Sequence, residues 1–371
     1  MGTPFTVTLE RIWELLTRRI DSMLFGAALA IVGVGLVTLF SASDQSVPRE
    51  TSQVMSLGFA IVLMWLFANI APQTLARIAV PLYLVAVVLL VCVAAFGVVV
   101  NGSRRWLNLG IARFQPSEMM KIALPLMLAW YFQKFEGRIG LRDFAFAAML
   151  IVVPVYLIKR QPDLGTSILI AASGFYVLYL AGLSWRIIIG LVAVAAAVGP
   201  VVWSHLHDYQ RERILTFLDP TRDPLGAGYH SIQASIALGS GGVAGKGWLH
   251  GTQTHLDFLP EKHTDFIFAV FGEEFGLIGN VVLLALYLLL IGRAVIITAG
   301  ASTLFARLVA GSITLMFFTY VFVNMAMVSG LLPVVGVPLP LVSYGGTALI
   351  SLFVGLGVLM SVQSHRKLVA S

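Results

Sequence analysis

A short polar stretch contains the residue of this chain whose chemistry stands out first. Between Leu259 and Phe266 it includes a lysine, a histidine and Asp265, and a strongly apolar segment follows directly. Asp265 therefore lies where water meets hydrocarbon, and an ionisable side chain is costly to keep at the mouth of a membrane helix. We predict a functional site at Asp265. The alternative is a carboxylate that only caps the helix.

A charged pair lies at the start of another apolar segment. Pro116 suits the first helical position, so Glu118 falls in the first turn and Lys121 lies three residues further, on the same face. In hydrocarbon such a pair must face the bundle interior or a wet cavity. We therefore predict that Glu118 and Lys121 line a cavity, with a plain ion pair as the alternative.

A third polar site precedes the apolar segment that begins near residue 164. It contains Gln161, Asp163 and Thr166. Asp163 is placed to cap the helix that follows, because a carboxylate before the first turn accepts hydrogen bonds from free backbone N–H groups. We expect the three residues to give structural support to the cavity.

The longest stretch without an apolar span covers residues 205–264, and connections of this length in a compact bundle tend to carry function. Its first part places Arg211 and Arg213 at a membrane surface, on a helix that is either functional or simply solvated. Its middle is rich in glycine around Lys246 and predicts a flexible turn or, alternatively, a nest of N–H groups that binds an anion. It is not a Walker A loop, because Ser240 replaces the first glycine and Gly247 replaces the Ser or Thr after the lysine.

The composition excludes a soluble protein. The chain has 371 residues, of which 58% are hydrophobic and 11% charged, and its mean hydropathy is +0.90. About ten segments are long and apolar enough to span a membrane, and they are too uniformly apolar for barrel strands. They are 23–42, 54–70, 80–100, 117–133, 143–158, 164–182, 186–204, 266–292, 304–328 and 343–362. We predict an all-α polytopic membrane protein with one domain over residues 1–371 and an amphipathic cytoplasmic lead over residues 1–22.

We expect the amino terminus to stay inside, and an even number of spans then places both termini in the cytoplasm, with residues 205–264 on the outer face. Most basic residues then agree with the positive-inside rule, and attraction to membrane lipids accounts for part of the net charge of +6. Five basic residues lie in short loops on the opposite face, where they indicate an anionic ligand: Arg104, Arg105, Arg113, Lys159 and Arg160. The single cysteine, Cys92, excludes a disulfide framework, and His263 has no partner at metal-ligand spacing.

Five motifs in order resemble the SEDS family of membrane proteins. They are QPSE (115–118), QPDLGTS (161–167), DP through GY (219–229), PE through HTDF (260–266) and GLLP through PLPLVSYGG (330–346). The resemblance runs from the first span to the last. Within the family, Val335 favours the branch that acts in rod shape, since the division branch usually has a lysine in that segment.

The resemblance implies a peptidoglycan glycosyltransferase. Such an enzyme polymerises lipid II on the outer face of the bacterial cytoplasmic membrane for cell elongation, beside a class B penicillin-binding protein that crosslinks the product, and no nucleic acid is involved. The family's essential Asp corresponds to Asp265, which we assign as general base for the 4-hydroxyl of the acceptor GlcNAc, with inversion at the donor MurNAc anomeric carbon. A helix dipole would make this Asp a weak base. Desolvation by the substrate could offset that effect, or Asp265 instead holds a divalent cation (Mg or Mn).

Basic and polar side chains near the outer face are the expected substrate contacts. Guanidinium and ammonium groups suit a diphosphate, and His263, Thr264 and Ser343 are expected at the rim of the site. The expected diphosphate contacts are Arg104, Arg105, Arg211, Arg213, Lys246 and Lys262.

Two rival functions fit a bundle with a charged cavity. A flippase for lipid-linked oligosaccharides needs a path to both faces, whereas the charged candidates gather toward the outer face. A scaffold that only recruits the penicillin-binding protein would not need Asp265.

Overall fold

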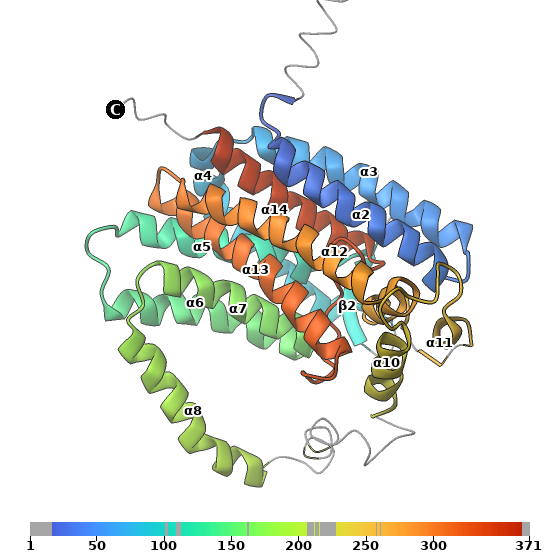
Figure 1. The fold of residues 1–371 in the computed structure, drawn as a ribbon. Helices are drawn as coiled ribbons and strands as arrows, with labels where there is room; N and C mark the ends of the chain where they lie inside the picture. Colours follow the sequence, from blue (N-terminus) through green and yellow to red (C-terminus); the bar gives the residue numbers. More distant parts are fainter. Residues whose placement is uncertain are drawn as a thin grey trace, which may run out of the picture.

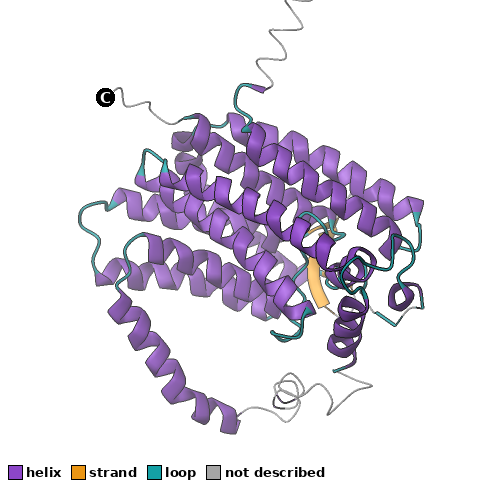
Figure 2. Cartoon of the chain, viewed as in Figure 1, coloured by secondary structure: helices purple, strands orange, loops and turns teal. Residues whose placement is uncertain are grey.

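The computed structural model describes residues 17–100, 103–108, 113–161, 163–205, 211, 215, 228–256, 258–259 and 261–365. These residues form a bundle of long helices with a small sheet at one end (Figures 1 and 2). The helices are α2 (Ser22–Ala42), α3 (Val47–Asn69), α4 (Pro72–Phe96), α5 (Pro116–Lys134), α6 (Leu141–Lys159), α7 (Leu164–Leu180), α8 (Trp185–His205), α10 (Tyr229–Ser240), α11 (Thr252–His255), α12 (Ile267–Ala299), α13 (Leu304–Val328) and α14 (Gly346–Ser364).

A helix lies in each of the ten segments predicted to span the membrane. Seven of them are long and apolar enough to cross it by length and composition. The other three are α7, which has 17 residues, α8, whose apolar run Trp185–Pro200 is short, and α5, which carries charged side chains. Most side chains of α5 are buried, so this polar helix lies inside the bundle. The predicted polytopic helical architecture is confirmed.

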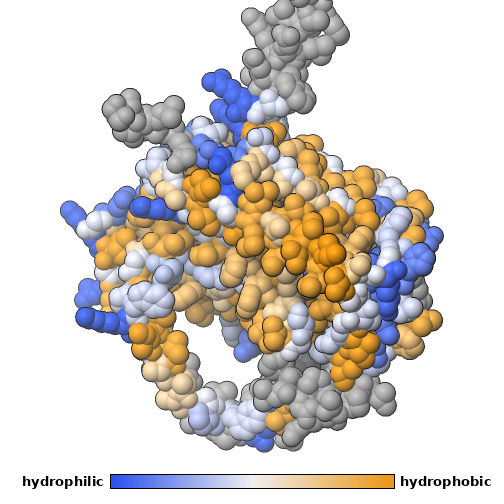
Figure 3. Space-filling model, viewed as in Figure 1, coloured by the Kyte–Doolittle hydropathy of each residue, from blue (hydrophilic) through white to orange (hydrophobic). Residues whose placement is uncertain are grey.

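The two ends of the bundle carry different elements. At one end, Arg19 and Ser361 donate hydrogen bonds to the carbonyls of residues 69 and 70, so the start of α2 meets the ends of α3 and α14. At the other end, Lys262 pairs with Asp44 at 2.9 Å, and α10, α11 and the strand β2 gather there (Figure 1). Apolar side chains cover the flank between them in Figure 3, as a lipid-facing surface requires.

A three-stranded antiparallel sheet between α4 and α5 corrects the all-helical prediction locally. It consists of β1 (Val98–Val100), β2 (Ser103–Asn108) and β3 (Arg113–Phe114), in the order β1-β2-β3. The sequence predicted one apolar span over 80–100, but α4 ends at Phe96. Three consecutive valines then enter a strand, since β-branched side chains suit an extended backbone better than a helix.

A kink in α12 receives the glycine-rich turn. Gly276 has φ 63° and ψ −161°, outside the helical region. Past this break, the N–H groups of Leu277 and Ile278 donate to the carbonyls of Gly242 and Val243, at 2.9 and 3.1 Å. The turn thus satisfies backbone groups that the kink frees from the helix.

The N–H groups considered for an anion nest are engaged in the same contact. The amide of Lys246 donates to the carbonyl of Glu273 and that of Gly247 to the carbonyl of Glu274, both at 3.0 Å, and the amide of Gly245 donates within the turn. A nest requires N–H groups that point at the anion. These N–H groups are engaged within the protein, so the contacts favour a turn that docks on α12 over an anion nest.

We expect Gly245→Ala to destabilise the protein. Gly245 has φ +82°, and a Cβ there would lie 2.1 Å from the carbonyl oxygen of Glu274. Positive φ and overpacking together cost on the order of 2 kcal/mol, which a thermal melt in detergent would show as a lower midpoint. Gly239→Ala is the matched control, because a Cβ at that helical position meets nothing within 4 Å. Equal melting points for the two variants would contradict the docking argument.

Candidate active site

A cavity of ≈ 650 Å³ lies at the end of the bundle that carries the sheet. The starts of α5, α7 and α14, strand β2, helix α13 and the segments 261–265 and 334–338 all contribute to its lining. Seven of the predicted site residues line this single cavity: Arg105, Glu118, Lys121, Asp163, Thr166, Thr264 and Asp265. Polar residues from motifs far apart in the sequence thus meet around one space.

Asp265 lies in the turn before α12 and does not cap that helix. The N-cap position belongs to Phe266, and no side chain makes a capping hydrogen bond there. The capping alternative is therefore wrong, and the Asp265 side chain lines the cavity instead.

Three successive backbone carbonyls hold this turn in place. The carbonyl of His263 accepts from the Tyr344 N–H at 2.9 Å, and that of Thr264 accepts from the Ser343 hydroxyl at 2.7 Å. The carbonyl of Asp265 accepts from the side-chain amide of Asn324 at 2.8 Å. Because the donors come from α13 and from the segment before α14, the turn is fixed from two sides.

The cavity surrounds Asp265 with other charged groups. The pKa of Asp265 is raised to about 6, mainly by burial and also by the nearby carboxylates of Glu261 and Asp163, while Arg105 acts in the opposite direction. The sequence predicted a weak base, because a helix dipole favours the ionised carboxylate. The direction of the pKa shift is opposite to that expectation, because Asp265 does not cap the helix and loss of water around its side chain disfavours the ionised form.

Asp163 and Arg105 form one wall of the cavity. Asp163 accepts a hydrogen bond from the Thr166 N–H at 3.1 Å, so its predicted capping role is confirmed. Its other oxygen lies 3.7 Å from the Arg105 Nε. Arg104 is exposed and, on a strand, its side chain points to the opposite face from Arg105. Gly165 brings α7 close to the opposite wall, since a Cβ there would lie 2.3 Å from the carbonyl oxygen of Val335.

Glu118 and Lys121 form a second wall, deeper between the helices. The Lys121 ammonium lies 2.6 Å from the Glu118 carboxylate and 5.1 Å from the centre of the Tyr320 ring. The Ser351 hydroxyl donates to the other Glu118 oxygen at 2.6 Å. Both charged side chains line the cavity, as the sequence predicted, and they also form the ion pair given as the alternative.

Two lysines expected at the diphosphate lie outside the cavity lining. Lys246 pairs with the buried carboxylate of Glu273 at 2.7 Å, and Lys262 contacts Asp44 and donates to the carbonyl of Thr254 at 3.0 Å. These cations fix the long loop to α12 and to the turn after α2, because a nearby carboxylate holds each ammonium.

Gln161, predicted as structural support, and Arg211, predicted as a diphosphate contact, both donate to backbone carbonyls. The amide of Gln161 donates to the carbonyl of Leu90 at 3.3 Å, and the Arg211 Nε donates to the carbonyl of Trp203 at 3.2 Å. The His263 ring lies beside Tyr344, and burial lowers the pKa of His263, which favours its neutral form. Arg213 lies outside the described residues.

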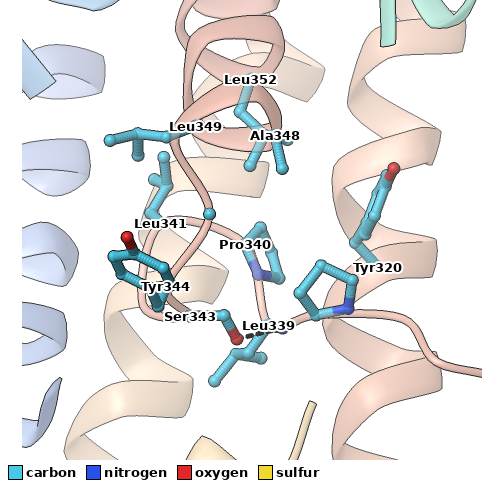
Figure 4. A pocket seen from close by; sticks show the side chains of 11 residues that line it. Tyr320, Leu339, Pro340, Leu341, Ser343, Tyr344, Ala348, Leu349 and Leu352 are labelled. Atoms are coloured by element: carbon cyan, nitrogen blue, oxygen red, sulfur yellow. Dashed lines mark hydrogen bonds between the residues drawn. The ribbon is translucent and has the colours of Figure 1, made fainter. Parts of the chain in front are cut away.

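The segment before α14 was predicted to start a span and instead forms an ordered loop over the cavity. Figure 4 shows a smaller pocket beside the cavity, in which Ser343 lies next to Leu339 below Pro340, with Tyr320 across from them on α13. The Ser343 hydroxyl accepts from the Leu339 N–H at 2.8 Å and donates to the turn that carries Asp265. The Ser343 hydroxyl, expected to contact substrate at the rim, is therefore hydrogen-bonded to backbone groups of the protein.

Sequence reasoning missed cavity residues that lie within apolar or proline-rich segments. Tyr320 is in the middle of α13, and Gly336 lies in the segment before α14 with φ +70°. Glu261 was seen only as part of a motif, although its carboxylate accepts from the Thr264 hydroxyl at 2.9 Å. Only Tyr320 gave a signal in the sequence, since a tyrosine inside an apolar span usually hydrogen-bonds its hydroxyl and so indicates a polar neighbour.

Comparison with known proteins gives consistent matches over nearly the whole chain. The family model for the cell cycle proteins FtsW, RodA and SpoVE matches residues 21–368. The chain is 51% identical to the peptidoglycan glycosyltransferase MrdB of Escherichia coli over 95% of both chains. It is 35% identical to the probable peptidoglycan glycosyltransferase FtsW of Trichlorobacter lovleyi over 94% of both. The higher identity to MrdB agrees with the branch that Val335 indicates.

Solved structures give the same result. A chain from a peptidoglycan synthase complex, studied for its coordination of polymerization and crosslinking, matches with a TM-score of 0.83 and 36% identity, covering 94% of this chain and 98% of that one. The rod shape determining protein RodA of Thermus thermophilus matches with a TM-score of 0.71 and 32% identity, covering 94% of this chain and 97% of that one. The motifs, the fold and the relatives agree: the chain belongs to the family of FtsW, RodA and SpoVE, which is the SEDS family that its motifs resemble.

Proposed function

We propose that this peptidoglycan glycosyltransferase polymerises lipid II into glycan strands at the outer face of the bacterial cytoplasmic membrane, with Asp265 as general base. One observation carries the proposal: a carboxylate fixed through its own backbone lines a cavity of ≈ 650 Å³, and burial raises its pKa to about 6. A base with a pKa near the operating pH is both ionised and able to take a proton.

In the proposed reaction, Asp265 accepts one proton while one glycosidic bond forms and the bond to the lipid diphosphate breaks. Asp265 takes the proton of the acceptor GlcNAc 4-hydroxyl, and that oxygen bonds to the anomeric carbon of the donor MurNAc. The bond from this carbon to the lipid diphosphate breaks, with inversion, and undecaprenyl diphosphate leaves with the electron pair. Asp265 then loses its proton to water.

The cavity offers positive ends of helices to the diphosphate. The first turns of α5, α7 and α14 contribute to its lining, and helix N-termini carry partial positive charge. Arg105 adds a guanidinium whose planar fork suits two phosphate oxygens. We assign diphosphate recognition to Arg105 and these helix starts.

A divalent cation remains the alternative role for Asp265. Within the described residues, no three His, Cys, Asp or Glu side chains are grouped so that they could hold a metal ion. A cation would therefore need oxygens from the diphosphate as well. Polymerisation that stops in EDTA and returns with Mg²⁺ or Mn²⁺ would favour this alternative.

The proposed partner is a class B penicillin-binding protein that crosslinks the strands. A relative with 36% identity was solved in a peptidoglycan synthase complex, which supports such an assembly here. We place the protein in the bacterial cytoplasmic membrane with both termini inside.

We expect activity to fall as the pH drops through about 6. Protonated Asp265 cannot accept the hydroxyl proton, and its raised pKa places this transition near 6, well above the ordinary value of 3.8. The acid limb of kcat/KM reports the free enzyme. A rate that stays flat down to pH 4.5 would remove Asp265 as a base that titrates in this range.

The direct test uses the full chain co-purified with its penicillin-binding partner. Purified lipid II is added, and the products are separated on a gel that resolves glycan strands. Long strands are the expected result. If no strands form, lipid II flipping in liposomes tests the transport alternative, and flipping without polymerisation would overturn the proposal.

A further inference from the structure

Asn324 is a buried polar side chain in the mostly apolar helix α13, and its exposed fraction is 0%. Its side-chain amide donates to the carbonyl of Asp265 at 2.8 Å and to the carbonyl of Val337 at 2.7 Å. These carbonyls belong to two separate segments, 261–265 and 334–338, that both contribute to the cavity lining. One side chain therefore joins two walls of the site.

The orientation of this amide follows from its partners. Two carbonyl oxygens can be met only by the NH2 group, because the amide oxygen has no hydrogen to donate. The Asn324 Oδ1 is left buried, with no hydrogen-bond partner in the described part of the chain. A buried acceptor without a donor costs stability, so stability alone gives a poor account of an asparagine here.

The contact acts at a narrow point of the cavity. A Cβ built on Gly336 would lie 3.4 Å from the Asp265 Oδ2, so the backbone of segment 334–338 passes directly beside the carboxylate. Asn324 bonds to the residue after Gly336 and to Asp265 itself. Its two hydrogen bonds therefore set the distance between the carboxylate and the facing backbone.

We propose that Asn324 is a positioning residue, which holds the Asp265 carboxylate at a fixed depth in the cavity by joining its turn to segment 334–338. The inference rests on the proposed role of Asp265 in polymerisation. Ser343 and Tyr344 hold the two preceding carbonyls, but among the described residues Asn324 is the side chain that bonds to the carbonyl of Asp265.

The test is Asn324→Ala, with Ser312→Ala as the matched control. Ser312 is also buried in α13, and its hydroxyl donates to the carbonyl of Ser173 at 2.9 Å, on α7 and away from the Asp265 turn. Each variant loses buried side-chain hydrogen bonding from the same helix. Both are measured as the complex with the penicillin-binding partner, after thermal melts confirm that they fold.

We expect Asn324→Ala to lower kcat about 10- to 100-fold, with KM for lipid II changed less than about threefold, since small misplacements of a reacting group have effects of this size. The acid limb of kcat/KM should move downward, because a looser turn lets water reach Asp265 while Glu261, Arg105 and Asp163, the charged groups that face it, are unchanged. Ser312→Ala should leave kcat and the acid limb near wild type.

Three results would overturn the inference: equal effects of the two variants, a kcat within twofold of wild type for Asn324→Ala, or a fall in kcat without movement of the acid limb. If Asn324→Ala does not fold, Asn324→Leu fills nearly the same volume, removes both N–H donors without adding a charge beside Asp265, and is judged by the same measurements. A wild-type complex that makes no strands defeats the proposed function, whereas an active wild type with an unaffected Asn324→Ala defeats only the positioning role.

Discussion

Asp265→Asn should reduce glycan polymerisation by about 10³-fold or more while the protein still folds and binds its partner. Asparagine has nearly the same shape, so the carbonyl hydrogen bonds to the turn remain, but it cannot take the acceptor proton. General bases contribute about 10²–10⁴-fold. Strand formation from lipid II by the co-purified complex is the measurement.

The same variant should melt at an equal or higher temperature at pH 7.5. The pKa of Asp265 is raised in the folded protein to about 6. An acid with a raised pKa opposes folding above its unfolded pKa, where folding must bury a charged carboxylate, and this penalty disappears with the neutral amide. Asp143→Asn, at the opposite end of the bundle, is the activity control. Full polymerisation by Asp265→Asn would end its role as the base.

Removing one member of the Glu118–Lys121 pair should destabilise the protein severely. Both side chains are nearly buried, with exposed fractions of 9% and 6%. Lys121→Met leaves the Glu118 carboxylate uncompensated, and breaking a buried pair in this way costs about 3–5 kcal/mol. The unfolding midpoint of the purified complex should fall, and polymerisation with it.

The double variant Glu118→Gln, Lys121→Met should recover most of the lost stability, since neither charge is then left alone. Activity should recover less than stability, because the pair also sets the charge of the cavity. Lys134→Met is the matched control on α5, as its ammonium is exposed and lies over the Trp130 ring. If the effects of Glu118→Gln and Lys121→Met on the unfolding midpoint simply add in the double variant, the two side chains are not coupled.

Hydropathy predicted the long helices well and their ends poorly. A run of apolar residues shows that a segment enters hydrocarbon, but not where a helix gives way to a strand. The valines at 98–100 illustrate this, because pairing with β2 decided their conformation. Likewise residues 343–345, predicted to begin a span, form a loop before α14, since Ser343 and Tyr344 donate hydrogen bonds to carbonyls of the turn that carries Asp265.

The sequence predicted the site residues that are charged and lie at the end of a helix. It did not predict correctly the residues whose position depends on partners far away in the sequence. Asp265, Asp163 and Glu118 all reach the cavity, because an ionisable group at a membrane helix end must face water or protein. Lys246 and Lys262 were predicted on the same grounds, but each forms an ion pair with a carboxylate distant in the sequence and so lies outside the cavity lining.

The three carbonyl contacts around Asp265 also bear on the order in which the chain is made. Their donors, at residues 324, 343 and 344, all follow Asp265 in the sequence, whereas Arg105 and Asp163 precede it. During synthesis the first walls of the cavity can enter the membrane long before the carboxylate is anchored. The turn that carries Asp265 is thus held on both sides only after residue 344 has left the ribosome, so a shorter chain has the early walls of the cavity without a fixed Asp265.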